Sequence, residues 1–392
     1  MPNIFKIKGK VQHYAWGGFE YIPQLLGLAN AEKKPFGEYW LGAHPQAPSV
    51  LENGHLLSDE IAKNEEALLG QKSAAKYHRL PFLFKVLDVR EMLSIQLHPS
   101  KKVAEKGFAK ENDLGVSLTA SHRNYKDDNH KPELMVALSD FWLLHGFKSP
   151  NLLEVTLRSI PEFSQLLQAF SSLSYSALYR QVMEMPQAEV NKILLPLLQR
   201  IIPAYRKKEL KKSDPNFWAA RAAEIFCSEE NFDRGIFSIY LLNLLQLKKG
   251  EGIFQPAGVL HAYLEGQNVE LMANSDNVIR GGLTPKHIDI EELLANVVTE
   301  PVVPQVIHAE QDGCYQTPAE EFRLCHQTIK SSTLYQPQSA LLVFCFTGAC
   351  ELIEKGKQAV VLHKGEAAFV KANTEFMIES EQGVEIFSAF TP

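Results

Sequence analysis

The segment from Gly250 to His261 has the spacing of a metal-binding turn. Gly250, Pro256, Gly258 and His261 follow the pattern G-x5-P-x-G-x-x-H. Glycine and proline shape a turn between two strands, so that the histidine projects from the second strand into a barrel. Imidazole is a common metal ligand. The alternative is a turn followed by an ordinary strand histidine, but four fixed positions favour a ligand.

A second segment places an amide and an imidazole on one face of a predicted strand. In Met92–Pro99, polar and apolar residues alternate strictly, so that Met92, Ser94, Gln96 and His98 share a side. Gln96 and His98 are two residues apart, and both can therefore reach one ion. The alternative is a half-exposed strand with a polar face toward solvent.

A third segment offers a carboxylate. If Pro132 opens a strand, Lys131 and Glu133 share a face. Taken alone, this segment is typical of a charged surface loop. Two histidines and one glutamate are, however, a known catalytic zinc set, and the oxygen of Gln96 would leave the ion accessible to substrate. The three segments together therefore predict a catalytic metal site.

Polar residues continue beyond His261 as far as Lys286. Tyr263 shares the strand face of His261, and Arg280 precedes a Gly-Gly pair where a backbone can approach a ligand closely. Arginine suits bidentate recognition of phosphate, and Lys286 adds a point charge. The alternative for both cations is solvated surface charge, which is the usual state of these residues.

These segments resemble the type I mannose-6-phosphate isomerases (phosphomannose isomerases) of the cupin superfamily. The Gly250–His261 turn resembles the second cupin motif, whereas the first motif, H-x-H in many cupins, is here Gln96-Leu-His98. The matching pieces occur in the order of the family over residues 12–290. They are His13–Gly17, Glu38–Pro45, Pro81–Lys85, Leu93–Pro99, Asn124–Asp127, Asn129–Glu133 and His261–Lys286.

The resemblance implies a reaction and a set of residues. The reaction is the zinc-dependent interconversion of mannose 6-phosphate and fructose 6-phosphate through a cis-enediolate, with one Zn²⁺ per chain. The base stays open among His130, Asp276, Glu270 and a zinc-bound water. The implied metal ligands are Gln96, His98, Glu133 and His261; the catalytic residues are Arg280, Lys131, His130, Asp276 and Glu270; the substrate-binding residues are Ser94, Lys85, Tyr263 and Lys286.

Two alternative functions fit parts of the pattern. A sugar-phosphate sensor without catalysis would keep the fold, but the presence of Arg280 and Lys131 argues against it. An iron-dependent cupin oxygenase would use a histidine-rich set, which the Gln96 ligand disfavours. The sequence leaves open whether other hexose or pentose phosphates are side substrates.

The elements that position these residues are predicted to be mainly strands. Residues 1–150 and 236–304 have the texture of short strands and turns and form the predicted catalytic barrel region. One helix interrupts them, with Ser58 as its N-cap. Residues 305–392 repeat short strands separated by glycines, as in a small barrel or jelly roll. The resemblance implies that this second barrel is a degenerate cupin without a metal-ligand set.

Residues 151–235 have helical spacing instead and predict an inserted helical subdomain. Leucines and isoleucines form an apolar stripe around Pro196, near which a helix should start or kink. Asp214 before Pro215 predicts an N-cap and the first residue of a helix. The predicted class is therefore mainly β, with cupin-type jelly-roll barrels and an α-helical insert.

Composition limits the partners. The 392 residues carry a net charge of −6, which disfavours general nucleic-acid binding. The amino terminus has no apolar signal region, and the most apolar stretch, Phe237–Leu247, is too short to span a membrane. Five scattered cysteines argue against a disulfide framework and for a reducing compartment. We therefore expect a cytoplasmic protein with a small sugar phosphate as partner and no nucleic acid or membrane; the sequence does not indicate an oligomeric state.

Overall fold

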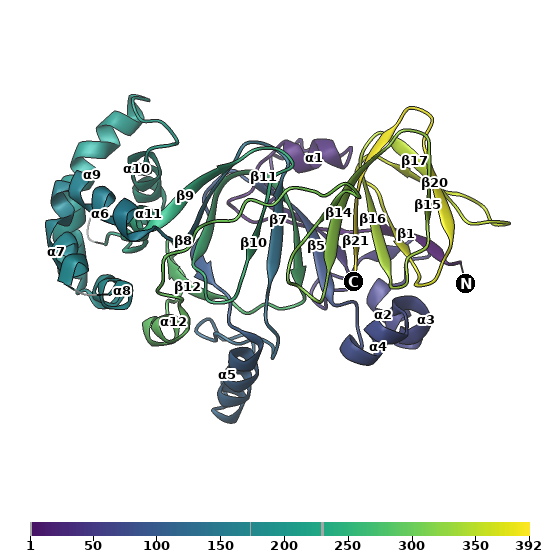
Figure 1. Ribbon diagram of the computed structural model, residues 1–392, viewed down its shortest axis with the longest axis horizontal. Helices are drawn as coiled ribbons and strands as arrows, with labels where there is room; N and C mark the ends of the chain where they lie inside the picture. The colour runs from purple at the N-terminus through teal and green to yellow at the C-terminus, as the bar shows by residue number, and fades with distance from the viewer. Residues whose placement is uncertain (1, 173, 229–230) are drawn as a thin grey trace.

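The computed structural model describes residues 2–172, 174–228 and 231–392. Three regions follow one another along its longest axis (Figure 1): a block of helices, a large antiparallel sheet in the centre, and the C-terminal strands. The prediction of a sheet-rich protein with a helical region is confirmed. In the described ranges no helix is both long and apolar enough to cross a bilayer.

The large sheet contains the predicted site. Six of its strands follow one another in the order β10-β7-β11-β5-β3-β2, and the others join through β11, which also pairs with β6 and β8. Its strands are β2 (Lys10–Gln12), β3 (Glu38–Gly42), β5 (Phe82–Val89), β6 (Ile95–Leu97), β7 (Glu133–Ala137), β8 (Phe141–Phe147), β9 (Leu242–Leu247), β10 (Gly252–Gln255), β11 (His261–Ala273) and β12 (Ile279–Gly282).

Strand β11 connects the two halves of the large sheet. Its second half, residues 266–273, pairs with β5 and β7, and its first half, residues 261–265, pairs with β6 and β8. The register shifts between Tyr263 and Glu265, as in a β-bulge, which bends a strand. One continuous strand therefore carries His261 into one half of the site and Glu270 into the other.

The C-terminal strands form two further sheets. In the C-terminal sheet, β1 and β4 of the N-terminal region pair beside β19, with Ile4 opposite Val370. The small sheet contains β15, β17, β18 and β20. The strands are β1 (Ile4–Lys8), β4 (Val50–Leu51), β13 (Cys314–Tyr315), β14 (Arg323–Ile329), β15 (Ser332–Tyr335), β16 (Leu341–Thr347), β17 (Ala349–Ile353), β18 (Val360–His363), β19 (Ala367–Val370), β20 (Phe376–Glu379) and β21 (Val384–Phe390).

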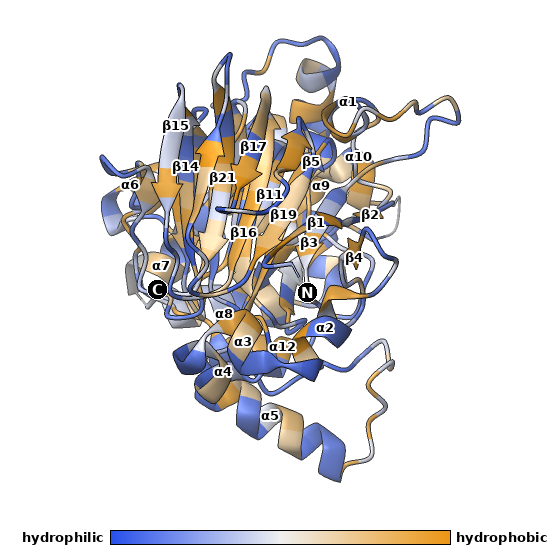
Figure 2. Cartoon of the chain, turned by 90° about the vertical axis from the view of Figure 1, so that its right-hand side faces the viewer, coloured by the Kyte–Doolittle hydropathy of each residue, from blue (hydrophilic) through white to orange (hydrophobic). Residues whose placement is uncertain are grey.

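A shared hydrophobic core joins the large sheet to the C-terminal sheet. Phe84 of β5 packs against Phe344 and Phe387, with ring centroids 5.5 and 6.5 Å apart. In Figure 2 the strands are mostly hydrophobic and many of the connecting loops hydrophilic. Because aromatic and aliphatic burial of this kind is the main favourable term in folding, the two β-rich regions stabilise each other.

The helical block packs on the other end of the large sheet. Its buried residues form one cluster with Ile95, Leu97 and Met92 of the segment that precedes the site. Met92 lies before β6, and besides contacting this cluster it lines one cavity together with Ser94 and Gln96. The helices of this block are α6 (Pro150–Ser159), α7 (Ser164–Ser172), α8 (Tyr175–Glu184), α9 (Gln187–Arg206), α10 (Pro215–Phe226) and α11 (Gly235–Leu241), with a 3₁₀ turn at Pro161–Phe163.

The N-terminal region contains more helix than predicted. Helix α2 begins at Leu57, after Leu56, so Ser58 lies inside the first turn and is not an N-cap. Its hydroxyl donates to Asp59 Oδ1 instead, at 3.3 Å. The remaining helices outside the helical block are α1 (Tyr21–Leu25), α2 (Leu57–Lys63), α3 (Glu65–Leu69), α4 (Gln71–Tyr77), α5 (Lys101–Asp113) and α12 (Ile290–Asn296).

The two predictions made at prolines of the helical block have different outcomes. Helix α9 starts at Gln187 and runs through Pro196 and Pro203, so of the predicted start or kink near Pro196 the start is wrong and the kink stays a prediction. The prediction at Asp214 is confirmed, because its carboxylate accepts from Asn216 N at 2.8 Å and Pro215 is the first residue of α10. Proline does not destabilise a helix at its first position, because an N–H group there would have no acceptor within the helix.

Replacing Asp214 with alanine is expected to destabilise the protein without changing its chemistry. The free energy of unfolding should fall by about 1 kcal/mol, because the N-cap hydrogen bond of α10 is lost. Chemical denaturation measures this difference. Asp214→Asn is the matched control, since asparagine caps a helix about as well as aspartate. Equal loss in both variants would contradict the capping role.

Contrary to the expectation from the sequence, Cys314 and Cys325 form a disulfide. They stand directly opposite each other on β13 and β14. Their spacing in the sequence did not indicate that they lie so close together. Cys345 and Cys350 are free and buried. Burial also raises the pKa of the Cys227 thiol to about 11, so this cysteine is not an activated thiolate.

Candidate metal centre and substrate cavity

Three predicted ligands converge inside the large sheet. His98 directly follows β6, Glu133 begins β7 and His261 begins β11. Their ligand atoms all lie within 4.8 Å of one another, and each side chain is at most 1% exposed. Glu133 Oε1 lies 3.3 Å from His98 Nε2, and its other oxygen lies 3.6 Å from His261 Nε2.

Backbone carbonyls orient both imidazoles. His98 Nδ1 donates to the carbonyl of Asn277 at 2.8 Å, and His261 Nδ1 donates to that of Val259 at 3.0 Å. Because a carbonyl only accepts, the proton of each neutral ring stays on Nδ1 and Nε2 keeps its lone pair. Metal-ligating histidines are commonly held in this way.

Three atoms at the centre need a further partner. His98 Nε2, Glu133 Oε2 and His261 Nε2 are buried and make no hydrogen bond within the described ranges. Leaving such atoms unsatisfied costs about 1–3 kcal/mol each. A nitrogen–nitrogen–oxygen set with lone pairs aimed at one point fits a zinc ion.

The electrostatics keep His98 and Glu133 in their metal-binding forms. Burial lowers the pKa of His98 to about 4, which leaves the ring neutral near pH 7. Burial alone would raise the pKa of Glu133, but the ammonium of Lys131 and the two histidines hold it well below its usual range. Neutral imidazoles and an ionised carboxylate are the forms that bind metal.

Gln96 lies between this centre and Arg280. In the strand pairing, Gln96 of β6 stands opposite His261 on one side and opposite Arg280 of β12 on the other. Directly opposed residues project from the same face of an antiparallel sheet. The predicted amide ligand and the predicted catalytic arginine are therefore neighbours.

A cavity of about 670 Å³ opens beside the centre. Most of the predicted catalytic and substrate-binding residues line it. Those that line it are Lys85, Ser94, Lys131, Asp276, Arg280 and Lys286, and the predicted metal ligand Gln96 lines it as well.

A buried polar row adjoins the cavity: Lys85 and Glu38 line it, whereas the predicted site residues Glu270 and Tyr263 are absent from its lining within the described ranges. Lys85 donates to Glu270 at 3.0 Å, and its Nζ lies 3.6 Å from a Glu38 oxygen. Tyr263 donates to the other oxygen of Glu270 at 2.9 Å. Although burial opposes its charge, Glu270 and Glu38 raise the pKa of Lys85 above its usual value. Burial and Glu270 together raise the pKa of Tyr263 well above its usual range, so its hydroxyl remains a donor.

A group of cations occupies another side of the cavity. Arg280, Lys286 and Lys126 line it, and burial lowers the pKa of Lys286 with further contributions from Arg280 and Lys126. Like charges lower one another's pKa only when they lie close together. The sequence did not single out Lys126, whose neighbours in sequence are typical of a charged loop.

Two further residues of the site were missed. Glu38 belongs to a segment that resembles the family, but nothing in its spacing assigned it to the cavity, which it lines. The side chain of Asn277 accepts from Lys126 N at 2.7 Å and donates to the carbonyls of Asp127 and Asn129, while its own carbonyl holds His98. Only the folded chain brings these loops together.

His130 is not brought into the cavity with the others. Its Nε2 pairs with Glu321 Oε1 at 2.6 Å, and it is absent from the cavity lining within the described ranges. The side chains of adjacent residues in extended backbone point in opposite directions. Lys131 therefore faces the metal centre, whereas His130 contacts the C-terminal region.

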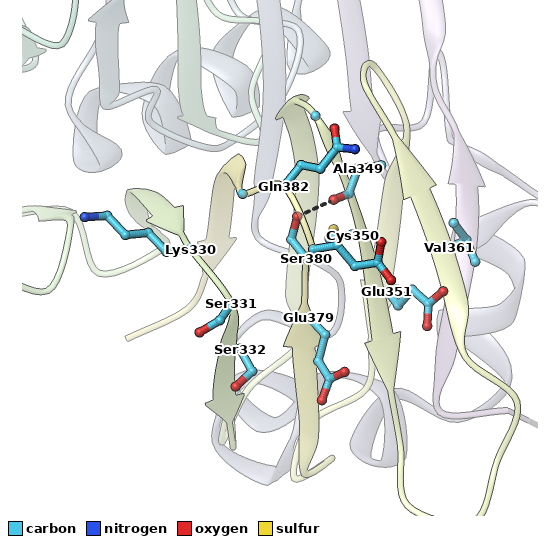
Figure 3. A pocket seen from close by; sticks show the side chains of 13 residues that line it. Lys330, Ser331, Ser332, Ala349, Cys350, Glu351, Val361, Glu379, Ser380 and Gln382 are labelled. Atoms are coloured by element: carbon cyan, nitrogen blue, oxygen red, sulfur yellow. Dashed lines mark hydrogen bonds between the residues drawn. The ribbon is translucent and has the colours of Figure 1, made fainter.

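A second cavity, of about 890 Å³, lies among the C-terminal strands (Figure 3). Glu351, Glu379 and Ser332 line it, and the Ser380 hydroxyl donates to the carbonyl of Ala349 at 2.8 Å. In the part of the chain that the structure describes, no group of metal-ligating side chains gathers there. The candidate site is therefore the cavity of the large sheet.

Known proteins are similar to this chain over most of its length. The model of the type I phosphomannose isomerase catalytic domain matches residues 4–150. Mannose-6-phosphate isomerase of Salmonella typhimurium is 38% identical over 384 residues, which cover 94% of this chain and 95% of that protein. The human mannose-6-phosphate isomerase is 34% identical over 323 residues, or 74% of this chain and 72% of that protein.

A solved structure is similar over both whole chains. It is the crystal structure of mannose 6-phosphate isomerase from Salmonella typhimurium bound to fructose 6-phosphate and zinc. The match has a TM-score of 0.87 and 34% sequence identity, and it covers 100% of each chain. Sequence and structure therefore indicate the same family.

Proposed function

The chain belongs to the type I phosphomannose isomerases, and we propose that the cavity of its large sheet interconverts mannose 6-phosphate and fructose 6-phosphate with one zinc ion per chain. The observation that carries the proposal is the buried His98–Glu133–His261 group beside a cavity lined by cations. Such a site suits an anionic sugar whose reaction develops negative charge on oxygen.

We assign the zinc ion to Gln96, His98, Glu133 and His261. Bound zinc supplies a Lewis acid that polarises the oxygens of the sugar and orients it. The hydrogen bonds at Nδ1 keep both imidazoles aimed at the ion without reorganisation. Gln96 would contribute an uncharged oxygen, so that the charge of the ion is only partly neutralised by Glu133.

Lys131 and Arg280 are the proposed stabilisers of the enediolate. Lys131 Nζ lies 3.1 Å from Glu133 Oε1, next to the metal centre. Arg280 stands opposite Gln96 across the β12–β6 pair. Fixed cations on two sides of the sugar can stabilise charge that develops on the oxygens of C1 and C2.

Asp276 is the best placed of the side chains predicted as bases. It lines the cavity, whereas His130 pairs with Glu321, and both oxygens of Glu270 accept hydrogen bonds from Tyr263 and Lys85. Gln46 donates to Asp276 Oδ2 at 2.7 Å and so fixes its orientation. We propose that Asp276 moves the proton between C1 and C2, and that Glu270 holds Lys85 and Tyr263 in place.

The phosphate group is assigned to the cationic side of the cavity. Lys286 and Lys126 supply point charges there, and Arg280 lies between them and the metal ligand Gln96. Ser94 and Lys85 line the cavity as well and are proposed to contact the sugar. A substrate bound in this way would place its phosphate away from the ion and its C1–C2 end close to it.

We propose the same division of the chain that the sequence suggested. Residues 1–150 with 236–304 form a catalytic cupin-type barrel, 151–235 the helical insert, and 305–392 a degenerate cupin barrel with a structural role. The helices α6–α10 support the insert, while β1 and β4 extend the C-terminal sheet from the N-terminal region. We also propose a cytoplasmic location, because sugar phosphates are charged and do not cross membranes.

The test of the proposed function is isomerase activity before and after chelation. The purified protein should convert mannose 6-phosphate to fructose 6-phosphate, lose that activity with a zinc chelator, and regain it when zinc is restored. Magnesium added back in place of zinc is the control, because a nitrogen-containing ligand set disfavours it. A folded, zinc-loaded protein without activity would contradict the proposed function.

A further inference from the structure

The loop between Arg280 and Lys286 has a strained backbone. Gly282 has a φ of +134° and Leu283 a φ of +52°, in the left-handed region. Leucine rarely adopts this conformation, which costs of the order of 1 kcal/mol or more unless the surrounding structure enforces it. The strain lies between two cations that line the substrate cavity.

A single carboxylate holds this loop from outside the cavity. Asp233, in the segment between α10 and α11, accepts from Leu283 N at 2.9 Å through Oδ1 and from Thr284 N at 3.0 Å through Oδ2. Its Oδ1 also accepts from Gly235 N at 2.7 Å. Asp233 is therefore hydrogen-bonded to the strained residue, to the residue after it and to the start of α11.

The backbones of the two segments are also in direct contact. A Cβ atom added at Gly282 would lie 2.4 Å from Gly235 Cα, and one added at Gly235 would lie 2.6 Å from Leu283 N. Only glycine permits so close an approach. The loop thus rests against α11, and Asp233 fixes it there.

We propose that Asp233 is a positioning residue for substrate binding: by holding Leu283 and Thr284, it sets the placement of Lys286, at the end of the same loop, for the phosphate of the sugar. The inference rests on the proposed function. Asp233 does not line the cavity within the described ranges, so it acts through the loop and not through substrate. A carboxylate suits this task because two oxygens can accept several N–H groups at once, and charge-assisted bonds are the stronger ones.

Asp233→Asn tests the proposal, because its amide nitrogen cannot accept the hydrogen bonds that one carboxylate oxygen accepts. We expect KM for mannose 6-phosphate to rise about tenfold, in line with the loss of a hydrogen bond to a charged group. The zinc content should stay at that of the unmodified protein. Asp214→Asn, at another aspartate that accepts a backbone N–H, is the matched control and should leave KM unchanged.

Two further measurements separate positioning from general damage. Hydrogen–deuterium exchange should quicken at Leu283 and Thr284 in Asp233→Asn and not in Asp214→Asn. In a double-mutant cycle with Lys286→Ala, the two effects on KM should be less than additive, because both act on one loop. An unchanged KM, additive effects, or a zinc content that falls together with activity would each overturn the proposal.

The test is independent of whether the reaction has been assigned correctly. Thermal stabilisation of the protein by inorganic phosphate reports the cation site without turnover, and Asp233→Asn should weaken the binding of phosphate about tenfold as well. If the unmodified protein binds phosphate but has no isomerase activity, the proposed function is contradicted. The positioning role is then still tested by comparing phosphate binding in the unmodified protein and in Asp233→Asn. If Asp233→Asn does not fold, Asp233→Ser, which keeps one acceptor oxygen, is compared in the same assays.

Discussion

Glu133→Ala is expected to remove zinc and isomerase activity together. The carboxylate is the one anionic member of the proposed ligand set and lies within 3.6 Å of the Nε2 atoms of both histidines. Without it, Lys131 loses its partner and its charge repels a cation at the same position. Zinc per chain should fall close to zero and activity by about 10³-fold, since a Lewis acid contributes several kcal/mol.

Elemental analysis of the dialysed protein and a turnover assay measure both effects. Glu60→Ala is a suitable control, because Glu60 is equally buried but pairs with Lys63 and His55 away from the cavity. That variant should lose stability and keep its zinc. Full zinc occupancy in Glu133→Ala would show that Glu133 is not a ligand.

Arg280→Ala should separate catalysis from metal binding. We expect kcat to fall about 10²- to 10³-fold, as when one preorganised donor to developing oxyanion charge is removed. The zinc content should be unchanged, because Arg280 is a neighbour of the proposed ligand Gln96 and does not belong to the proposed ligand set. Steady-state kinetics with parallel metal analysis tests both statements.

The conservative variant sharpens the interpretation of this prediction. Arg280→Lys keeps the positive charge but loses the planar fork of donors, so it should recover only part of kcat. Loss of zinc with unchanged turnover per bound ion would instead assign Arg280 to the support of the metal site. A rise in KM alone would assign it to the phosphate.

The residues of the proposed metal centre were predictable because each belongs to a short pattern of neighbouring residues. Alternation placed Gln96 and His98 within reach of one ion, and the glycine–proline turn placed His261 at the start of a strand. Both patterns depend on the alternation of side chains along an extended chain, and this alternation can be seen directly in the sequence. The cluster of His98, Glu133 and His261 confirms that these segments meet, while the roles of the individual residues stay predictions.

The features that sequence did not predict depend on pairing between distant segments. His130 and Lys131 are adjacent and both polar, so the sequence did not indicate which of them faces the cavity. In the structure His130 contacts Glu321, which is distant in sequence, and not the cavity. Asn277 supports His98 from a loop that is remote in sequence. The Cys314–Cys325 disulfide follows from strand register, and helix α2 begins at Leu57 although Ser58 is the better capping residue. Tertiary packing overrides local preference in such cases.

The pairing of β1 with β19 constrains how the chain can fold. Ile4 needs a partner strand around Val370, which is synthesised long after it. The aromatic core of Phe84, Phe344 and Phe387 likewise cannot form before the C-terminal strands are present. During translation, β1 and one face of the large sheet would therefore stay uncovered until the strands from β16 to β21 have been made. Contacts of such long range slow folding and expose apolar surface to aggregation, which makes these strands a kinetic requirement for the folded enzyme.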